Sequence, residues 1–377
     1  MTSYTTEAVE LLQRLIATPS VSREENKAAD IMEQTLRNYG YNPERHGNNV
    51  WVKSPDWSDE RPTVLLNAHI DTVKPVATWT RDPFTPSIES IDTTDTQGQP
   101  HTEKRLYGLG SNDCGGGLVS LLQVFRALSG HPEDHAAYNL IYLASCEEEV
   151  SGAGGIRSVL PMLPPVSVAI VGEPTGMQPA IAERGLMVID ATAHGKSGHA
   201  ARGEGINAIN EALDDLLFLR DYRFEKVSPL LGPTKMQCTV INSGTQHNVV
   251  PDECHFIIDV RTNEYYTNEE VFDFLQGKMK SELKARSFHL HSSSIPQEHP
   301  LVRRCIEMGM TPFGSPTLSD QALMRFPSLK LGPGQSARSH SADEYICLHE
   351  IDNAIETYLT LLTGLDELRI MITREPH

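Results

Sequence analysis

Hydrophobic residues near the start of the chain recur at helical spacing. Val9, Leu12 and Leu15 fall on one face, which predicts an amphipathic helix. A second helix is expected after Ser22, because Ser22 and Glu25 have the spacing of a capping box. Later stretches with the same periodicity lie at 117–128, 155–160 and 349–362.

Short runs of apolar and β-branched residues alternate with these helices. They lie at 49–53, 63–69, 138–146 and 167–172. Strands that are buried on both faces have such unbroken apolar runs, whereas half-exposed strands alternate. The alternation of runs and helices therefore predicts an α/β domain with a mostly parallel sheet and helices on both faces.

The middle of the chain has a different pattern. Residues 253–261 alternate, with Phe256, Ile258 and Val260 on one side, which is typical of a half-exposed antiparallel strand. Helices are predicted over 206–218 and 268–283. We therefore expect a smaller α+β domain, an antiparallel sheet with two helices, inserted into the larger one. The predicted domains are 1–178 with 292–377, and 179–291.

Composition narrows the possible partners. The 377 residues contain 32 Lys and Arg against 50 Asp and Glu, a formal net charge of −18, which argues against nucleic acid or an anionic membrane as partner. No apolar run approaches the roughly 18 residues that span a bilayer. The six cysteines form no close pairs, and the start has no basic region before an apolar core. These features predict a cytoplasmic protein.

Several strand ends and loops carry residue types that bind metals. They are His69, Asp71, Asp113 in a glycine-rich loop, Glu147, Glu148, Glu149, Glu173 and the late His340. Each stretch alone is compatible with a polar turn. Ligand sites of open α/β sheets gather at the carboxyl ends of the strands, so the set together favours a functional site. A nucleotide site is disfavoured, because no phosphate-binding Lys follows the glycines.

The order of these motifs resembles the M20 family of co-catalytic zinc amidohydrolases over essentially the whole chain. The resemblance implies two divalent metal ions, Zn in the first place and Co or Mn as alternatives, because nitrogen and oxygen ligands suit these metals. It implies that Asp113 bridges the two ions. His69 and Glu173 would complete one ion, and Glu148 and His340 the other.

The resemblance also assigns roles next to the metals. Glu147 would be the general base that acts on the metal-bound water, and Asp71 would orient His69. Cys114 departs from the family, which often has Met or Lys there. An extra ligand or an oxidation site are possible roles, and a small buried residue is the favoured one. The Asp113–Cys114 peptide bond is expected to be cis, as in the family.

A further catalytic residue, His199, and three substrate-binding residues, Asn248, Arg261 and Gly334, are also expected. In the family, the residue matching His199 reaches a neighbouring subunit's active site and hydrogen bonds to the oxyanion. Asn248 matches a second position near substrate, and Arg261 matches an Arg that holds a substrate carboxylate. Gly334 lies in a loop, 332–336, that could present N–H groups to an α-carboxylate. A homodimer formed through the inserted domain is implied.

Within the family, the chain looks most like the acetylornithine deacetylase branch. This implies metal-dependent hydrolysis of the amide bond of an N-acyl amino acid, N-acetyl-L-ornithine or N-succinyl-L-ornithine, in arginine biosynthesis. A dipeptidase or carboxypeptidase and a succinyl-diaminopimelate desuccinylase remain alternatives. A non-catalytic metal-binding scaffold is disfavoured, because it would have little use for Glu147, which is not assigned as a ligand.

Overall fold

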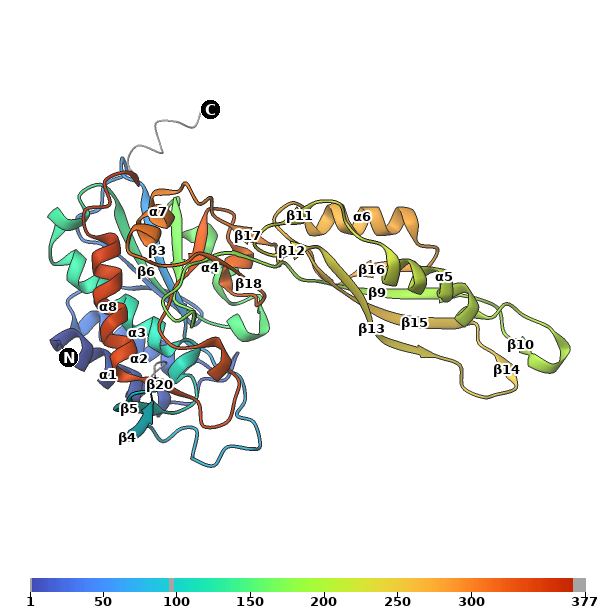
Figure 1. The fold of residues 1–377 in the computed structure, drawn as a ribbon, viewed down its shortest axis with the longest axis horizontal. Helices are drawn as coiled ribbons and strands as arrows, with labels where there is room; N and C mark the ends of the chain where they lie inside the picture. The colour runs from blue at the N-terminus through green and yellow to red at the C-terminus, as the bar shows by residue number, and fades with distance from the viewer. Residues whose placement is uncertain (1, 95–97, 369–377) are drawn as a thin grey trace. The chain divides into compact units, whose positions relative to one another are not determined.

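The computed structural model describes residues 2–94 and 98–368, and the chain divides into two compact units (Figure 1). The first unit consists of Met1–Ile181, Ile295–Phe313 and Ser319–His377, and the second of Ala182–Ser294 and Gly314–Leu318. The predicted domain boundaries, after residues 178 and 291, each lie three residues before the corresponding limit of a unit. The short 314–318 segment of the second unit had no counterpart in the sequence prediction.

The first unit is built on a sheet whose centre is parallel. Its strands follow the order β1-β2-β6-β3-β7-β19 and then β8, where the chain passes to the second unit. The strands are β1 (Glu44–His46), β2 (Asn49–Lys53), β3 (Thr63–His69), β6 (Asn139–Ser145), β7 (Val168–Val171), β8 (Ala180–Glu183) and β19 (Ser328–Lys330). β6, β3, β7 and β19 are parallel, whereas β1, β2 and β8 pair antiparallel. The predicted mostly parallel central sheet is confirmed.

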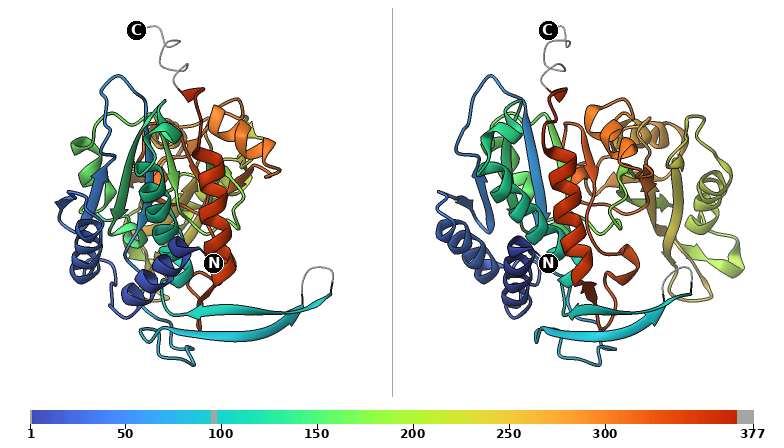
Figure 2. Two further views of the ribbon diagram at one scale, coloured as in Figure 1. Left: turned by 90° about the vertical axis from the view of Figure 1, so that its left-hand side faces the viewer. Right: turned by 60° about the vertical axis from the view of Figure 1, so that its left-hand side comes forward.

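Helices cover both faces of this sheet (Figures 1 and 2). They are α1 (Ser3–Ile16), α2 (Asn26–Asn38), α3 (Gly116–Ser129), α4 (Ile156–Val159), α7 (Pro300–Glu307) and α8 (Leu348–Leu362). On one face, the Tyr142 hydroxyl donates to the Leu118 carbonyl of α3. On the other, Leu65 and Ile141 pack in one apolar cluster with Ile156 of α4. Side chains of β3 and β6 thus alternate between two cores, which explains their unbroken apolar sequences.

The start of α3 lies directly against the end of β7. A Cβ added to Gly117 would lie 1.8 Å from the Gly172 carbonyl oxygen, so only glycine allows this approach. The contact brings the glycine-rich loop before α3 to the carboxyl ends of β3 and β7. This is the edge at which open α/β sheets place their sites.

A separate three-stranded sheet lies beside the start of α8 (Figure 2). The β4 (Ser87–Thr94) and β5 (Pro100–Tyr107) strands form a hairpin, and β20 (Tyr345–Cys347) pairs with β5. Because β20 runs straight into α8, the hairpin and the start of this helix are neighbours.

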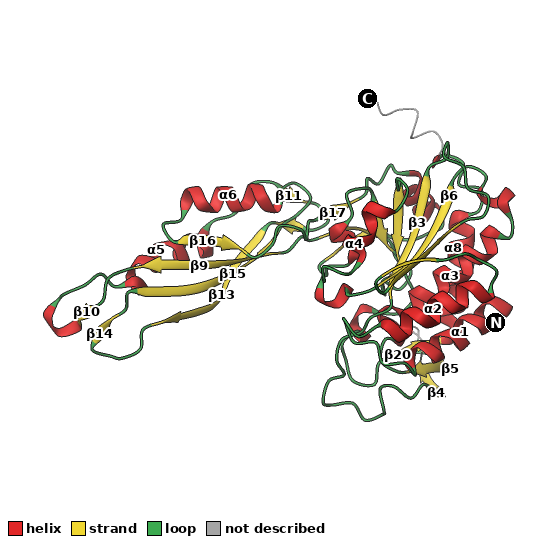
Figure 3. Cartoon of the chain, turned by 180° about the vertical axis from the view of Figure 1, so that it is seen from behind, coloured by secondary structure: helices red, strands yellow, loops and turns green. Residues whose placement is uncertain are grey.

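The second unit is an antiparallel sheet with two helices (Figure 3). Its strand order is β13-β15-β9-β16, and the elements are β9 (Met187–His194), β13 (Lys235–Ser243), β15 (Glu253–Arg261), β16 (Glu282–Ala285), α5 (Ala208–Asp221) and α6 (Asn268–Lys278). Phe256, Ile258 and Val260 are buried in the core of this unit, as their alternation predicted.

Two local predictions are wrong. The helix expected over 268–283 ends at Lys278, and residues 282–285 form strand β16. The capping box expected for Ser22 and Glu25 does not form, because α2 begins one residue after Glu25. The Ser22 hydroxyl donates instead to the Asp71 carboxylate at 2.7 Å.

Candidate metal centre

His69 ends the central strand β3 and is buried. Its Nδ1 lies 2.9 Å from the Asp71 carbonyl oxygen, so Nε2 faces the neighbouring strand ends. Nε2 lies 3.4 Å from Asp113 Oδ1 and 3.7 Å from Glu173 Oε1. Burial lowers the pKa of His69, but Cys114, Asp113 and Asp71 outweigh it and leave the pKa well above its usual range. The environment of His69 therefore favours a positive charge.

Asp113 lies between the two histidines of the site. Its second oxygen, Oδ2, lies 3.4 Å from His340 Nε2. The Asp113–Cys114 peptide bond is cis, as predicted. The backbone before it is held by Glu344, whose Oε1 accepts the N–H groups of Asn112 at 2.8 Å and Asp113 at 3.0 Å.

Glu344 is a site residue that the sequence analysis missed. It is buried, and burial is the main cause that raises the pKa of Glu344 to about 8. Its position four residues after His340 carries no recognisable pattern. Only the fold shows that its carboxylate closes on the glycine-rich loop.

Asp71 has backbone partners in addition to His69, the residue that it was predicted to orient. Its carboxylate accepts the N–H groups of Glu148 at 3.1 Å and Glu149 at 3.2 Å, and Oδ1 lies 3.6 Å from His69 Nδ1. His69, Ser22 and the Glu148 N–H hold the pKa of Asp71 below its usual value, although burial acts to raise it. Asp71 thus fixes the acidic turn after β6 as well as facing His69.

The structure does not bring Glu147 to the metal-ligand cluster. Glu147 has a φ of 54°, and its carboxylate accepts the Gly154 N–H at 3.2 Å. A Cβ on Gly152 would lie 1.8 Å from Glu147 Oε2, so the side chain lies over a glycine segment. The Glu147 N–H donates to buried Glu25 at 3.2 Å. The left-handed turn directs the side chain of Glu147 away from His69 and Asp113.

Glu149, rather than Glu148, lies beside the late histidine. Glu149 Oε2 is 2.9 Å from His340 Nε2. Ligand atoms of His69, Asp113 and Glu149 all lie within 4.8 Å of one another. The hydrogen bond to Glu149 is the main cause that raises the pKa of His340 to about 9. The geometry therefore favours Glu148 and Glu149, in place of the predicted pair Glu147 and Glu148.

Two other carboxylates carry strongly shifted pKa values. Burial raises the pKa of Glu148 well above its usual range, His69 lowers it, and Glu173, Asp320 and Glu149 raise it further. Burial also raises the pKa of Glu173 to about 8, assisted by Asp113. Closely spaced carboxylates repel one another unless a cation or a proton offsets them.

The donor atoms fit a pair of divalent ions. His69 Nε2 and Glu173 Oε1 are buried and have no hydrogen-bond partner within residues 2–94 and 98–368. Such buried polar atoms are costly unless something else satisfies them. Two imidazoles and three carboxylates, with Asp113 between the histidines, are ligands of the kind that zinc takes.

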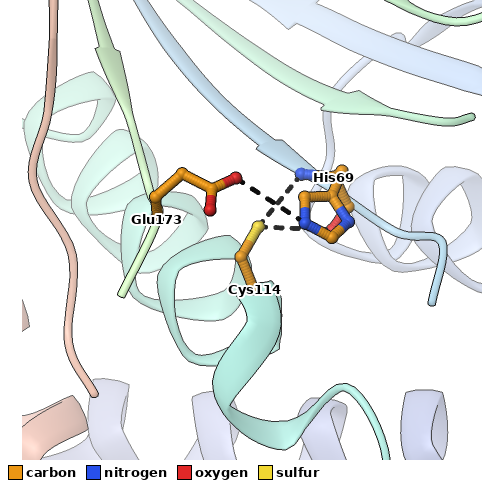
Figure 4. Close-up of side chains that lie close together, drawn as sticks. All are labelled: His69, Cys114 and Glu173. Atoms are coloured by element: carbon orange, nitrogen blue, oxygen red, sulfur yellow. Dashed lines mark hydrogen bonds and ion pairs between the residues drawn. The ribbon is translucent and has the colours of Figure 1, made fainter. Parts of the chain in front are cut away.

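Cys114 is a neighbour of this cluster, and Figure 4 shows it between His69 and Glu173. Its Sγ accepts the His69 N–H at 3.2 Å, and it is buried. Burial raises the pKa of the Cys114 thiol, which favours the protonated form. The expectation of a small buried residue agrees with these contacts, although the sulfur lies within 4.8 Å of donor atoms of His69 and Glu173.

The second unit carries His199, predicted as catalytic, and two predicted substrate-binding residues, Asn248 and Arg261. His199 is exposed, and its Nδ1 accepts the Ala201 N–H at 3.2 Å. Asn248 lies in an exposed loop. The Arg261 guanidinium donates twice to the Asp259 carboxylate, at 2.9 and 3.1 Å.

Gly334 lies in the first unit, in the loop before His340. It has a φ of +86°, and an added Cβ would lie 2.2 Å from Asn112 Oδ1. The same amide oxygen accepts the Gln335 N–H at 2.9 Å. Gly334 is therefore required for the loop to close on the segment that carries Asp113.

Comparison with known proteins relates part of the chain to a described family and the whole chain to curated relatives. Residues 181–287 match the peptidase dimerisation domain of the M20 family. The acetylornithine deacetylase of Proteus mirabilis is 27% identical over 373 residues, which cover 90% of this chain and 91% of that protein. Residues 181–287 therefore carry an M20-type dimerisation domain, and the whole chain is similar to an acetylornithine deacetylase.

Solved structures of this M20 fold extend over nearly the whole chain. Aminopeptidase PepT of Bacillus cereus has a TM-score of 0.72 at 16% identity and covers 97% of this chain and 98% of its own. A dinuclear metal binding peptidase of the M20 family from Bacillus subtilis has a TM-score of 0.68 at 16% identity, with 99% of both chains covered.

Among the helices of residues 2–94 and 98–368, none has the length and apolar character that a membrane span requires.

Proposed function

We propose that this M20 enzyme uses two divalent metal ions to hydrolyse the amide bond of an N-acyl amino acid. The observation that carries the proposal is the position of Asp113, with one oxygen 3.4 Å from His69 Nε2 and the other 3.4 Å from His340 Nε2. One carboxylate between two imidazoles suits a ligand shared by two ions. With Asp113 shared, His69 and Glu173 would hold one ion, and Glu149 and His340 the other.

Zinc is the proposed metal, with cobalt or manganese as substitutes. When bound, two such ions polarise the scissile carbonyl and make water a better nucleophile at neutral pH. The three carboxylates of the proposed ligand set leave a charge of +4 − 3 = +1 on two divalent ions. That residual charge suits a transition state in which negative charge develops on oxygen.

Glu148 is the proposed general base, in place of Glu147. A base must lie near the ligands without being one of them. Glu149 contacts His340, and Glu147 lies over glycines. The Glu148 N–H is fixed by Asp71, and its carboxyl interacts electrostatically with His69 and Glu173. Its carboxylate accepts no hydrogen bond from the residues that the structure describes, so it is free to take a proton from water and return it to the leaving amine.

Substrate binding is proposed for Arg261 and Asn248, as the family resemblance implies, and for Gly334, whereas His199 is proposed as a catalytic residue. The Arg261 fork can hold a carboxylate bidentately, and in this structure Asp259 occupies it. A substrate carboxylate would have to displace Asp259. His199 would donate a hydrogen bond to the developing oxyanion from the partner subunit.

A homodimer through the second unit is part of the proposal. Ile209, Leu213 and Leu217 of α5 recur every four residues and are 39%, 47% and 46% exposed. β13 is an edge strand of the same unit and carries exposed Val240 and Ile241. An exposed apolar stripe beside an open sheet edge is typical of a protein interface. The match of this region to a dimerisation domain supports the same reading.

N-acetyl-L-ornithine is the first proposed substrate, because the relative from Proteus mirabilis is an acetylornithine deacetylase. With that substrate, the reaction would belong to arginine biosynthesis in the cytoplasm. A peptide is the second candidate, because the solved relatives from Bacillus are named as an aminopeptidase and a peptidase.

The test compares amine release from N-acetyl-L-ornithine, N-succinyl-L-ornithine, N-succinyl-diaminopimelate and a set of dipeptides, with added zinc and then with a chelator. Chelator-sensitive release from one acyl amino acid would support the deacylase and name the acyl group. Release from dipeptides alone would replace the proposed substrate class. No release from any of them by the metal-loaded enzyme would contradict both.

A further inference from the structure

A second group of metal-binding side chains lies where the β4–β5 hairpin meets the start of α8. Ligand atoms of Glu103, Cys347 and His349 all lie within 4.8 Å of one another. Glu103 is on β5, Cys347 ends β20, and His349 is in the first turn of α8. None of the three belongs to the cluster around Asp113, and the proposed reaction does not use them.

We propose that Glu103, Cys347 and His349 form a separate binding site for a divalent ion of the zinc type. A thiolate, an imidazole and a carboxylate are the three side-chain groups that zinc takes in proteins. An ion bound there would join the hairpin, β20 and α8.

The second oxygen of Glu103 lies near a possible fourth donor. Arg105 holds Glu103 Oε1, at 2.6 Å from Nε and 2.5 Å from an Nη atom. Glu103 Oε2 lies 3.8 Å from His101 Nε2, and His101 is two residues earlier on the same side of β5. The arginine thus orients the carboxylate and leaves one oxygen for an ion, with His101 within reach as the fourth ligand.

Cys347 is placed to supply a thiolate. It is the N-cap residue of α8, and its backbone N–H donates to the Glu350 carboxylate at 2.8 Å. N–H groups at the start of a helix favour negative charge on a cysteine sulfur. Without an ion the thiol is a hydrogen-bond neighbour of Glu103, and burial, Glu350 and Glu103 raise the pKa of Cys347 to about 12. Binding would replace the thiol proton by the metal–sulfur bond and release one proton to solvent.

His349 gives the site an opening to solvent. The side chain of Cys347 is buried, whereas His349 and His101 are exposed. An ion can therefore reach the buried sulfur and the partly buried carboxylate through the histidines, without a change in the core.

Cobalt is a suitable probe, because a cobalt–thiolate bond gives a charge-transfer absorption that nitrogen and oxygen ligands lack. The full-length protein, freed of metal, is titrated with Co²⁺ in the wild type, in Cys347→Ser and in Cys114→Ser. Cys114 is the matched control, since it is the buried cysteine next to His69. We expect the absorption in the wild type and in Cys114→Ser, and its loss in Cys347→Ser.

A histidine pair tests the site without changing the core. His349→Gln should weaken Co²⁺ binding at the thiolate site at least about tenfold, as loss of a metal ligand does, whereas exposed His131→Gln should not change it. No thiolate absorption in the wild type, absorption that persists in Cys347→Ser, or equal affinity in His349→Gln would each overturn the proposal. These readouts do not depend on turnover, so they leave the proposed deacylase untouched.

Discussion

The acidic triplet after β6 shows how much one residue of register matters for the proposed chemistry. Three consecutive glutamates can supply a base and a ligand in two ways. The resemblance chose Glu147 and Glu148, whereas the geometry favours Glu148 and Glu149, because Glu147 turns toward Gly154 and Glu149 contacts His340. The sequence carries no clear mark of this difference, since it depends on the left-handed φ of Glu147.

Glu148→Gln should therefore abolish most turnover. Loss of a general base typically lowers kcat by about 10²–10⁴-fold, and the amide keeps the size of the side chain. The measurement is kcat on the substrate identified above, with the metal content checked by mass spectrometry. Glu147→Gln is the matched control and should keep kcat close to wild type. A severe loss in Glu147→Gln with normal activity in Glu148→Gln would restore the original assignment.

Glu149→Ala should reduce metal binding rather than only the chemical step. This carboxylate lies 2.9 Å from His340, so its removal leaves one proposed ion with a ligand missing. We expect affinity for the second ion to fall at least about tenfold while the first ion stays bound. Calorimetric titration of the metal-free protein with Zn²⁺ measures both steps. Two unchanged binding steps would exclude Glu149 as a ligand.

At the scale of elements, the site depends on how closely α3 approaches β7. Gly117→Ala places a Cβ 1.8 Å from the Gly172 carbonyl oxygen. To relieve this clash, the start of α3 would have to move away from β7, and the preceding loop with Asp113 would move with it. Overpacking of this kind typically costs about 1–3 kcal/mol. Urea unfolding measures the change in the free energy of unfolding.

The control for that prediction is another helical glycine. A Cβ on Gly277 of α6 would meet no described atom within 4 Å. Gly277→Ala should leave stability unchanged or raise it by up to about 1 kcal/mol, because alanine has the higher helix propensity. Equal effects of the two substitutions would show that the close approach at Gly117 is not a constraint.

Periodicity predicted the elements better than it predicted their ends. The buried runs of β3, β6 and β7 and the alternation of β15 follow directly from side-chain burial, so the sequence indicates them. The end of α6 at Lys278 and the cap of α2 depend on competing contacts. Ser22, for example, hydrogen bonds to Asp71, which is 49 residues away and cannot be read from local spacing.

The candidate site was likewise predictable where residues follow the ends of recognisable strands, and not where long-range contacts decide. His69, Asp113, Glu173 and His340 lie at strand ends or in loops, and the structure brings all four together. Glu344 was missed, because its role is to accept N–H groups from a loop more than 200 residues earlier in the chain. Residues that hold a backbone in place have no side-chain pattern of their own.

At the scale of the whole molecule, the acidic surplus favours separate copies, whereas the exposed apolar stripe on α5 favours a dimer. A net charge of −18 opposes nonspecific association, so a dimer needs a defined apolar contact. Leu213 and Leu217 are nearly half exposed and lie one turn apart on α5. About half of each side chain remains to be buried, so packing between two copies contributes about 1 kcal/mol for each.

Leu213→Glu combined with Leu217→Glu should therefore convert a dimer into monomers. Two like-charged stripes would face each other across the interface, whereas the fold of each copy should survive because neither side chain is buried within the chain. Sedimentation velocity measures the oligomeric state, and Met162→Glu, at an exposed residue of the first unit, is the matched control. If His199 acts on the partner's substrate, the monomeric double variant should also lose kcat. A monomeric wild type with full activity would contradict both the interface and the proposed role of His199.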